Sequence, residues 1–520
     1  MDTGTVPIRR ALFSTFDPSG LDRLAAALAR YGVELWATEG TRRSLLDAGV
    51  SVHPAEELTG IGSWFGGRIK TLHPGILGGL LAPRDAAGLR ELDEHHLKPI
   101  DLVATNFYPF ERRFAANPTA PEVVESIDIG GVTLARAAAK NYESVAILTS
   151  PDQYATAIGE LEACAGGTTA AFRRTLAGAA FARVQAYDRV IALALGSPPP
   201  HGEVVFPPGV SFSRDPTPLR YGENPHQRAQ PYVLHEPPGV PLDPVPIERL
   251  QGEALSFTNL LDLDTAVGLV AEFPSPSAAV VKHATPCGVA SGANLREAIE
   301  RALATDPVAR YGCVLAVNRA LTLHDTEALH GVFVDLLAAP AVDASEREAL
   351  AHRKKLKLVR LQPPTLATPR WEVKSALGRL LVQETDRREL VPGDFGLATS
   401  KGATAEQLCA LDFAWRVVRH AKSNAVVLAQ GSTTVGIGSG QPTRVKAVEL
   451  ACEVAGDRAK GSVLASDAFF PFADGVEAAG AAGVAAIIQP GGSVRDVEVI
   501  AAAERAGIAM YRTGWRVFRH

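Results

Sequence analysis

A lysine and a histidine stand side by side in the second half of the sequence. Lys282 and His283 occur in the segment AVVKHATPCGVA (279–290), directly after a strand-like apolar run. An imidazole titrates near neutral pH, so it can accept a proton from a reacting amine, and a neighbouring ammonium can stabilise negative charge on an oxygen. The adjacent pair is therefore a candidate proton-transfer site. The alternative interpretation is an ordinary charged pair on the protein surface.

The segment IDIGGVTLARAAAKN (127–141) could bind an anionic ligand. Its Gly-Gly pair opens a predicted helix, whose free backbone amides attract negative charge. Thr133, Arg136 and Lys140 are three and four residues apart, which places them on one helix face. Asp128 precedes the turn, so a carboxylate and an amine could meet at one site. The alternative is a capped helix with an ordinary charged face.

A second glycine-rich segment, GGRIKTLHPG (66–75), carries Arg68, Lys70 and Thr71. Glycines let the backbone approach a ligand closely, and the cations favour an anion there. A solvated basic turn is the alternative interpretation.

Two further segments have competing interpretations. In VGIGSGQPTR (435–444), the glycines precede Asp457 by about 20 residues, which is the separation in a dinucleotide-binding fingerprint. However, the glycine spacing is G-x-G-x-G, and Pro442 stands where a helix should begin. A nicotinamide oxidoreductase is therefore kept only as an alternative. SDAFFPFADG (466–475) clusters three Phe with two Asp, which suits a core corner or a pocket for a flat heterocycle.

A zinc-deaminase motif is incomplete in this sequence. Such sites need H-x-E or C-x-E followed by P-C-x-x-C. Pro286 and Cys287 are followed by Ala290 where the second cysteine belongs, and Thr285 is not a glutamate. We therefore predict no catalytic metal.

The elements that must position these residues follow an alternating pattern. Strand-like runs alternate with helical patterns, which predicts a parallel sheet with helices on both faces and ligands beyond the carboxyl ends of its strands. In the first domain the predicted strands are 11–16, 33–38, 100–106 and 145–149, and the predicted helices are 21–28, 41–48 and 133–140. The runs AAVVKH, GCVLAVN, SNAVVLAQ and VAAIIQ predict an α/β fold for the C-terminal region as well.

Composition limits the function class. A net charge of −5 over 520 residues argues against a dedicated binder of nucleic acid or anionic membrane. The five cysteines are scattered, the N-terminus lacks a signal-peptide pattern, and the apolar run 478–488 is shorter than the ~20 residues of a membrane span. These features predict a cytoplasmic protein.

Proline-rich stretches predict a first domain at 1–196, a linker at 197–218 and a region at 219–520 with a lobe boundary near 365.

Taken together, the motifs resemble a known family. GGRIKTLHP, NFYPF, IDIGG, LRYGENPHQ, VKHATPCGVA, GIGSGQPTR and SDAFFPFAD occur in the order found in the bifunctional purine-biosynthesis family, from about residue 8 to the C-terminus. That family joins a formyltransferase acting on aminoimidazole carboxamide ribonucleotide (AICAR) to an inosine monophosphate (IMP) cyclohydrolase. The resemblance implies formyl transfer from 10-formyltetrahydrofolate to AICAR, followed by dehydrative ring closure of the formylated product (FAICAR) to IMP.

The resemblance also implies a fold and partners. An N-terminal domain like methylglyoxal synthase, built on a parallel sheet, would precede two α/β lobes like cytidine deaminase without zinc. Members are homodimers with formyltransferase sites at the subunit interface. Their substrates are small nucleotides and folates, with no nucleic acid or membrane partner and no catalytic metal. Whether a structural monovalent cation binds is left open.

Site residues follow from the matching motif positions. The catalytic matches in the cyclohydrolase are Lys70, Tyr108, Asp128 and Lys140, and those in the formyltransferase are Lys282, His283 and Asn424. The nucleotide-binding matches are Ser14, Thr41, Arg68, Thr71, Arg220, Tyr221, Asn259, Asp335, Arg444 and Arg516. Phe469 and Asp474 would face the pterin of the folate.

The chain departs from the family pattern at a few positions. Pro18 replaces the lysine of the usual D-K-[ST]-G phosphate loop, and Glu39 replaces a glycine of [ST]-x-G-G-T. Like charges near a phosphate weaken its binding unless Glu39 turns outward. RYGC (310–313) and Arg379 also differ from the usual residues. A first domain that only senses nucleotides is the alternative function, and the matches at the four cyclohydrolase positions favour the enzyme.

Overall fold

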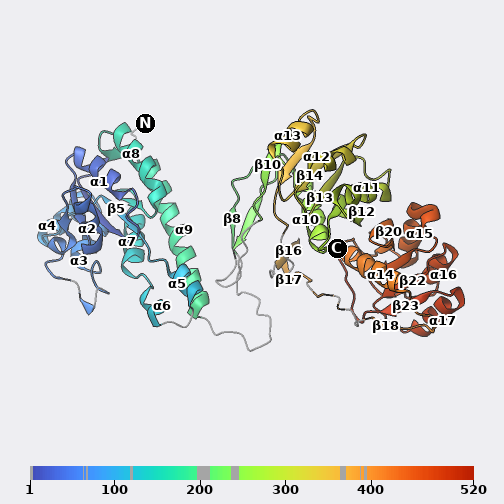
Figure 1. Ribbon diagram of the computed structural model, residues 1–520. Helices are drawn as coiled ribbons and strands as arrows, with labels where there is room; N and C mark the ends of the chain where they lie inside the picture. Colours follow the sequence, from blue (N-terminus) through green and yellow to red (C-terminus); the bar gives the residue numbers. More distant parts are fainter. Residues whose placement is uncertain are drawn as a thin grey trace. The chain divides into compact units, whose positions relative to one another are not determined.

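The computed structural model describes residues 4–62, 64–65, 68–117, 121–195, 211–235, 245–363, 371–386, 388–389, 391 and 395–520 (Figure 1). The described residues up to 195 fall in one compact unit, and those from 211 onward fall in a second. Most of the predicted linker (197–210) and the predicted lobe boundary near 365 lie outside the described residues, so both boundaries stay predictions.

The first unit is built on a five-stranded sheet in which every neighbouring pair is parallel. The strand order is β4-β3-β2-β5-β6, with β4 at His53–Pro54, β3 at Glu34–Ala37, β2 at Arg10–Thr15, β5 at Leu102–Asn106 and β6 at Ala146–Leu148. The parallel sheet and its four predicted strands are confirmed. The strand order reverses direction between β2 and β5, which is the point where such sheets bind ligands.

Helices cover this sheet on opposite faces. Parallel crossovers are right-handed, so α1, which leads from β2 to β3, and α7, which leads from β5 to β6 in the other direction, lie on opposite sides. In Figure 1 the long helix α9 runs beside α7. The helices are α1 Leu21–Arg30, α2 Glu39–Asp47, α3 Pro74–Leu81, α4 Ala86–Glu94, α5 Phe110–Ala116, α6 Pro121–Glu125, α7 Gly130–Lys140, α8 Tyr154–Ala163 and α9 Ala170–Leu195. A strand pair β1 (Val6–Pro7) and β7 (Gly167–Thr168) and the short 3-10 helices η1 (Ala55–Leu58) and η3 (Pro151–Gln153) complete the unit.

The second unit contains one twelve-stranded sheet that repeats a pattern twice. Each half has a helix, an antiparallel hairpin and then three strands parallel to one another, and the halves join where β12 pairs with β20. The first half comprises β10 Glu248–Gln251, α10 Phe257–Ala271, β11 Ser277–Lys282, β12 Thr285–Ser291, α11 Leu295–Thr305, β13 Cys313–Val317, α12 Leu323–Thr326, η4 Glu327–Leu329, β14 Val334–Ala339, α13 Ala344–Leu350 and β15 Lys357–Arg360. The second comprises β18 Gly396–Leu397, α14 Ala405–Val418, β19 Val426–Gln430, β20 Thr433–Gly438, α15 Arg444–Ala455, η5 Gly456–Ala459, β21 Val463–Ser466, α16 Asp474–Ala481, β22 Ala486–Gln489, α17 Asp496–Ala506 and β23 Ala509–Arg512.

A hydrophobic core continues across both halves. Buried side chains of α10 and α14, such as Leu269 and Trp415, pack together with Val281 of β11 and Val427 of β19. Separate cores under α11 and under α15 to α17 cover the rest of the sheet. Two small antiparallel pairs, β8 (Ser211–Arg214) with β9 (Tyr232–His235) and β16 (Trp371–Ala376) with β17 (Arg379–Glu384), lie outside the large sheet. The predicted mixed α/β fold is confirmed. Among the described residues, no helix has the length and apolar character that a membrane span requires.

Candidate active sites

A pocket of about 470 Å³ lies at the carboxyl ends of β2, β3 and β5 in the first unit. The location is the point of strand reversal at which the parallel sheet predicts a ligand. Seven of the eight residues predicted for the cyclohydrolase line this pocket: Ser14, Thr41, Arg68, Lys70, Thr71, Tyr108 and Asp128.

One end of the pocket is a cradle of hydroxyl groups. The Thr15 N–H donates to Thr41 Oγ1 at 2.9 Å, and the Thr38 hydroxyl lies within 3.4 Å of both Ser14 Oγ and Thr41 Oγ1. Thr38 is also the residue that precedes α2, so the free amides at the start of that helix face the same region. Hydroxyls and a helix N-terminus together favour a phosphate.

Asn106 is a residue of this cradle that sequence reasoning missed. Its Oδ1 accepts from the N–H groups of Phe16 and Asp17 at 2.7 and 2.8 Å, which holds the loop after β2. Its position as the last residue of β5 was the available signal.

Glu39 does not face the phosphate cradle. Its carboxylate pairs with Arg43 one helical turn later at 3.3 Å, and both side chains are exposed. The pocket is lined by Thr38, Gly40 and Thr41 but not by Glu39. The glutamate that departs from the family pattern therefore turns outward. Pro18 is exposed in the loop before α1 and supplies no charge.

Asp128 is held at the start of α7. Its Oδ1 accepts from the Gly131 N–H at 2.7 Å and its Oδ2 from the Tyr108 N–H at 3.3 Å. Burial raises the pKa of Asp128, while these two hydrogen bonds and the charge of Lys70 oppose the rise. A side chain at Gly131 would place its Cβ 2.9 Å from Asp128 Oδ2, so the glycine leaves room for the carboxylate.

Tyr187 of α9 is a second residue that sequence reasoning missed. Its hydroxyl accepts from the Asp128 N–H at 2.9 Å and donates to the Ser126 carbonyl at 3.2 Å. Nothing in the local sequence links α9 to this site, because the contact spans 59 residues.

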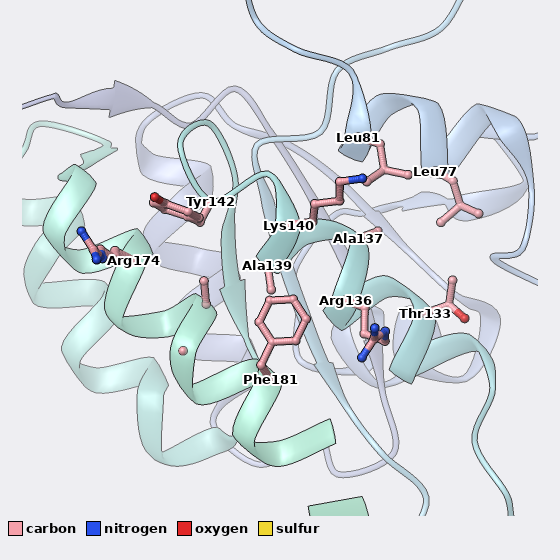
Figure 2. Close-up of a pocket in the computed structure, with 12 residues that line it drawn as sticks. Leu77, Leu81, Thr133, Arg136, Ala137, Ala139, Lys140, Tyr142, Arg174 and Phe181 are labelled. Carbon is pink, nitrogen blue, oxygen red and sulfur yellow. The ribbon is translucent and has the colours of Figure 1, made fainter. Parts of the chain in front are cut away.

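Lys140 lies in a different hollow from Asp128. Figure 2 shows Lys140 beside Leu77 and Leu81 of α3, in a hollow of about 750 Å³ that Thr133 and Arg136 also line. These three polar residues of α7 share one face, as their spacing predicts. Asp128 precedes the other end of α7, and at 1.5 Å per helical residue the ten steps from Gly130 to Lys140 span about 15 Å. Within one chain, the structure does not bring Lys140 to the pocket of Asp128.

In the second unit, His283 sits at the tip of the β11–β12 hairpin. Lys282 pairs with Thr285, so His283 and Ala284 are the two loop residues, and both have positive φ (56° and 53°). The Lys282 ammonium donates to the Tyr311 carbonyl at 2.9 Å. His283 is exposed and Lys282 half-buried.

Asp262 of α10 supports this turn and was missed by sequence reasoning. Its Oδ1 accepts from the Ala284 N–H at 2.5 Å. Burial raises the pKa of Asp262, while that hydrogen bond and the charges of His283 and Lys422 oppose the rise. The same carboxylate thus lies within the electrostatic reach of the hairpin of the first half and of a lysine of the second.

Asn424 lies at the same edge of the sheet as His283. Ala290 of β12 pairs with Thr433 of β20, and Gly438 of β20 pairs with Val426 of β19, so the start of β12 and the start of β19 share one edge. Two strand spacings separate them, or about 10 Å. The structure therefore brings the predicted catalytic residues of the two halves together.

Four predicted nucleotide-binding residues gather around the start of α10. Arg220 stacks on Tyr221 at 5.4 Å and pairs with Glu253, and the Phe257 N–H donates to the Tyr221 carbonyl. Asn259 Nδ2 donates to Asp335 Oδ2 at 3.0 Å. The Asp335 carboxylate also pairs with Lys357 at 2.7 Å, a buried lysine that sequence reasoning missed.

The remaining predicted residues lie near the end of β21. Arg444 is buried and pairs with Asp467, which is fully buried. Phe469 is exposed and Asp474 begins α16. Arg516 stacks on Phe518 at 4.6 Å, in a C-terminal segment whose Val517 N–H donates to the Asp467 carbonyl.

The glycines of VGIGSGQPTR serve packing. A Cβ at Gly436 or Gly438 would lie 2.0 Å from a carbonyl oxygen of α15, so both glycines let that helix approach β20. This contact accounts for the pattern without a dinucleotide. Among the described residues, no group of three or more His, Cys, Asp or Glu side chains is arranged to hold a metal ion.

Comparison with known proteins decides the family. Residues 138–454 match the family model of the AICARFT/IMPCHase bienzyme, and residues 20–133 match that of the MGS-like domain. The bifunctional purine biosynthesis protein PurH of Dinoroseobacter shibae is 42% identical over 100% of both chains. The protein of the same name from Chloroflexus aurantiacus is 44% identical over 99% of this chain and 100% of the relative. The chain belongs to the AICARFT/IMPCHase bienzyme family.

The bienzyme is accordingly an enzyme of purine biosynthesis with a transferase and a hydrolase activity, AICAR formyltransferase and IMP cyclohydrolase. The predicted function and the MGS-like N-terminal fold are confirmed. The alternatives of a nicotinamide oxidoreductase and of a purely sensing first domain are not favoured.

Proposed function

We propose that the two activities of the bienzyme divide between the two units. The pocket at the carboxyl ends of β2, β3 and β5 closes the ring, and the edge of the large sheet at His283 and Asn424 transfers the formyl group. The observation that carries this assignment is the convergence of seven predicted cyclohydrolase residues on one pocket.

Ring closure needs orientation and charge stabilisation more than strong acid–base chemistry. The carboxamide nitrogen of FAICAR attacks the formamide carbon, and an oxyanion forms on the formyl oxygen. That oxygen gains two protons, one lost by the carboxamide nitrogen and one lost by the formamide nitrogen, and it leaves as water. The hydroxyl cradle with Arg68 and Thr71 holds the phosphate, and Asp128 holds the carboxamide. Tyr108 and Lys140 donate to the developing oxyanion, and Lys70 supports charge or proton transfer. Arg68 pairs with Glu125 of the same pocket, and a bound phosphate would replace Glu125 as the partner of the arginine.

Lys140 joins this site from a second copy of the chain. Its ammonium lies too far along α7 to reach a substrate held by Asp128 of its own chain. A homodimer would supply the lysine of one subunit to the pocket of the other. The bienzyme is therefore proposed to act as a homodimer in ring closure, and the resemblance implies that its formyltransferase sites also lie at the subunit interface.

Formyl transfer requires removal of a proton from a weakly nucleophilic amine. The AICAR amine attacks the formyl carbon of 10-formyltetrahydrofolate, His283 takes the amine proton, and the C–N bond to the folate breaks as the folate nitrogen regains its electron pair and a proton. Lys282 stabilises the tetrahedral oxyanion. Arg220, Tyr221, Asn259, Asp335, Arg444 and Arg516 are proposed to bind or orient the nucleotide, and Phe469 and Asp474 to face the pterin.

A coupled ultraviolet assay tests the assignment. The purified full chain should form IMP from AICAR and 10-formyltetrahydrofolate, and it should also form IMP from supplied FAICAR without folate. Formation of FAICAR alone would leave the first unit a nucleotide-binding module. We place the reaction in the cytoplasm, without a catalytic metal.

A further inference from the structure

Asn424 is held by its neighbours on three sides. Its side-chain Nδ2 donates to the carbonyls of Gln441 at 2.8 Å and Pro442 at 3.2 Å, and its Oδ1 accepts from Arg444 Nη2 at 2.6 Å. A side-chain amide has two N–H donors and an oxygen with two lone pairs. Both N–H donors are therefore used within the protein. These contacts leave one lone pair of Oδ1 to accept a further hydrogen bond.

The orientation of the amide is fixed by the chemistry of its partners. Arg444 can only donate, and the carbonyls of Gln441 and Pro442 can only accept. A flipped amide would set N–H against guanidinium and oxygen against two carbonyls. Asn424 therefore presents an acceptor to the substrate, whereas a role in holding the formyl oxygen would require a donor.

Arg444 is itself held by buried groups. Its Nη1 pairs with Asp467 Oδ1 and donates to Ser466 Oγ at 3.0 Å and to the Ala425 carbonyl at 3.2 Å. Arg444 is 6% exposed and Asp467 is 0% exposed. A buried cation without its carboxylate is strongly disfavoured, so Asp467 keeps Arg444 in place.

Asp467 also accepts hydrogen bonds from the two residues on either side of Asn424. Its Oδ2 accepts from the Ser423 hydroxyl, and its Oδ1 accepts from the Ala425 N–H at 3.1 Å. Asn424 is thus fixed through both its neighbours in the chain, which Asp467 holds, and through its own amide, whose oxygen Arg444 holds and whose nitrogen the Gln441 and Pro442 carbonyls hold.

We propose that Asp467, acting through Arg444 and through the backbone on either side of Asn424, is a positioning residue for formyl transfer, and that the Asn424 oxygen it orients accepts an N–H of the attacking AICAR amine. This inference rests on the proposed role of Asn424. An acceptor at that point aligns the amine, so its remaining proton can pass to His283 across the shared edge of the sheet.

The test compares Asp467→Asn with the wild type in each half-reaction. Misalignment of a reacting group costs roughly 100-fold in rate, so kcat for formyl transfer should fall by about that factor while KM for AICAR changes little. Ring closure of supplied FAICAR should be unchanged. The matched control is Asp325→Asn, a buried aspartate that caps α12 and should leave both reactions intact.

A double-variant cycle separates positioning from a purely structural role. If Asp467 acts through Asn424, then Asp467→Asn should cost nothing further in an Asn424→Ala background. An equal loss in both backgrounds would overturn the inference, as would wild-type transfer by Asp467→Asn. If Asn424→Ala alone transferred formyl normally, the proposed role of Asn424 would fail instead.

A milder variant covers the case in which Asp467→Asn does not fold. Ser423→Ala removes one hydrogen bond to Asp467 and leaves the buried ion pair whole. It should lower kcat several-fold with KM unchanged. Unchanged turnover in this variant would overturn the inference.

Discussion

His283 occupies a backbone conformation that costs free energy. Positive φ costs a residue other than glycine about 1–2 kcal/mol, and His283 and Ala284 both adopt it. A two-residue hairpin loop of this kind is most favourable with Asn-Gly. The chain instead places an imidazole at the tip, where it projects from the edge of the sheet. A histidine held in this strained backbone conformation favours a role in chemistry over a role in folding.

Replacing His283 should therefore separate chemistry from binding. We expect His283→Ala to lower formyl-transfer turnover by at least ~100-fold, because the amine proton loses its acceptor. Nucleotide binding and ring closure should be retained. Ala284→Gly is the matched control: it relieves the positive φ of the neighbouring residue, so it should keep turnover and raise the unfolding temperature. Near wild-type transfer by His283→Ala would remove the imidazole from the mechanism.

Asp128 is a second residue at which function opposes stability. Burial raises its pKa, so the folded state holds the proton more tightly than the unfolded chain does. The resulting contribution to stability is present at low pH and is lost as pH rises from the ordinary value of 3.8 through the raised value. Above that raised value, the charged carboxylate is therefore a cost to the fold.

Asp128→Asn should abolish ring closure, and its thermal midpoint relative to wild type should increase as pH rises through the raised pKa of the native carboxyl. The constant part of the difference reflects the acceptor oxygen that the amide lacks for the Gly131 or Tyr108 N–H. Thermal unfolding scans of both proteins at several pH values measure this difference. Unchanged formyl transfer would show that the second unit is intact in the variant. A difference independent of pH would mean that the carboxylate charge is not the source.

At the scale of elements, the sequence predicts strands and helices better than the contacts between them. The predicted runs at 11–16 and 100–106 became β2 and β5, and the structure shows that these two strands pair in parallel. Periodicity also placed Thr133, Arg136 and Lys140 on one face of α7. It could not say which hollow that face lines, because this depends on how α3 and α9 pack against α7.

The same limit explains the residues that were missed. Asn106, Asp262 and Tyr187 act through hydrogen bonds to segments far away in the chain. Asn106 ends a predicted strand, which was its one signal in the sequence, whereas composition and spacing carry no signal for Asp262 and Tyr187. Asp467 lies within a motif that drew attention for its aromatic residues, and its burial with Arg444 emerges only from the fold. The proposed roles of the site residues stay predictions.

The loop between β2 and α1 offers a test of the phosphate cradle. The cations lining the pocket are Arg68 and Lys70, and Arg68 already has Glu125 as a partner. Pro18→Lys would add an ammonium at an exposed position of this loop. One new charge-assisted phosphate contact should contribute on the order of 1–2 kcal/mol, or roughly tenfold in nucleotide affinity.

Titration calorimetry with IMP measures this change. Pro18→Gln is the matched control, since it alters the backbone in the same way without adding charge, and it should leave the affinity where it was. An unchanged dissociation constant for Pro18→Lys would mean that the loop points away from the phosphate.

At the scale of the whole molecule, the two activities make different demands on assembly. The residues proposed for formyl transfer, His283 and Asn424, share one edge of a sheet within a single chain. Of the residues proposed for ring closure, Asp128 precedes α7 and Lys140 ends it. The proposed cyclohydrolase site therefore needs a second copy to unite them, and the hollow around Lys140, with its apolar floor of Leu77, Leu81 and Phe181, is the face that would meet that copy.

Subunit mixing tests this arrangement. Asp128→Ala and Lys140→Ala should each be inactive in ring closure as separate homodimers. In a mixed dimer, the pocket of the Lys140→Ala subunit keeps Asp128 and receives Lys140 from its partner, so one of its two sites is whole. Random exchange of equal amounts makes about half of the dimers mixed, and activity should recover to about one quarter of wild type. Formyl transfer should be normal throughout, because both substitutions lie in the first unit. If Lys140 instead acted within its own chain, each mixed dimer would contain two damaged pockets and mixing would restore nothing. If Lys140→Ala alone closed the ring at the wild-type rate, the lysine would have no part in the reaction.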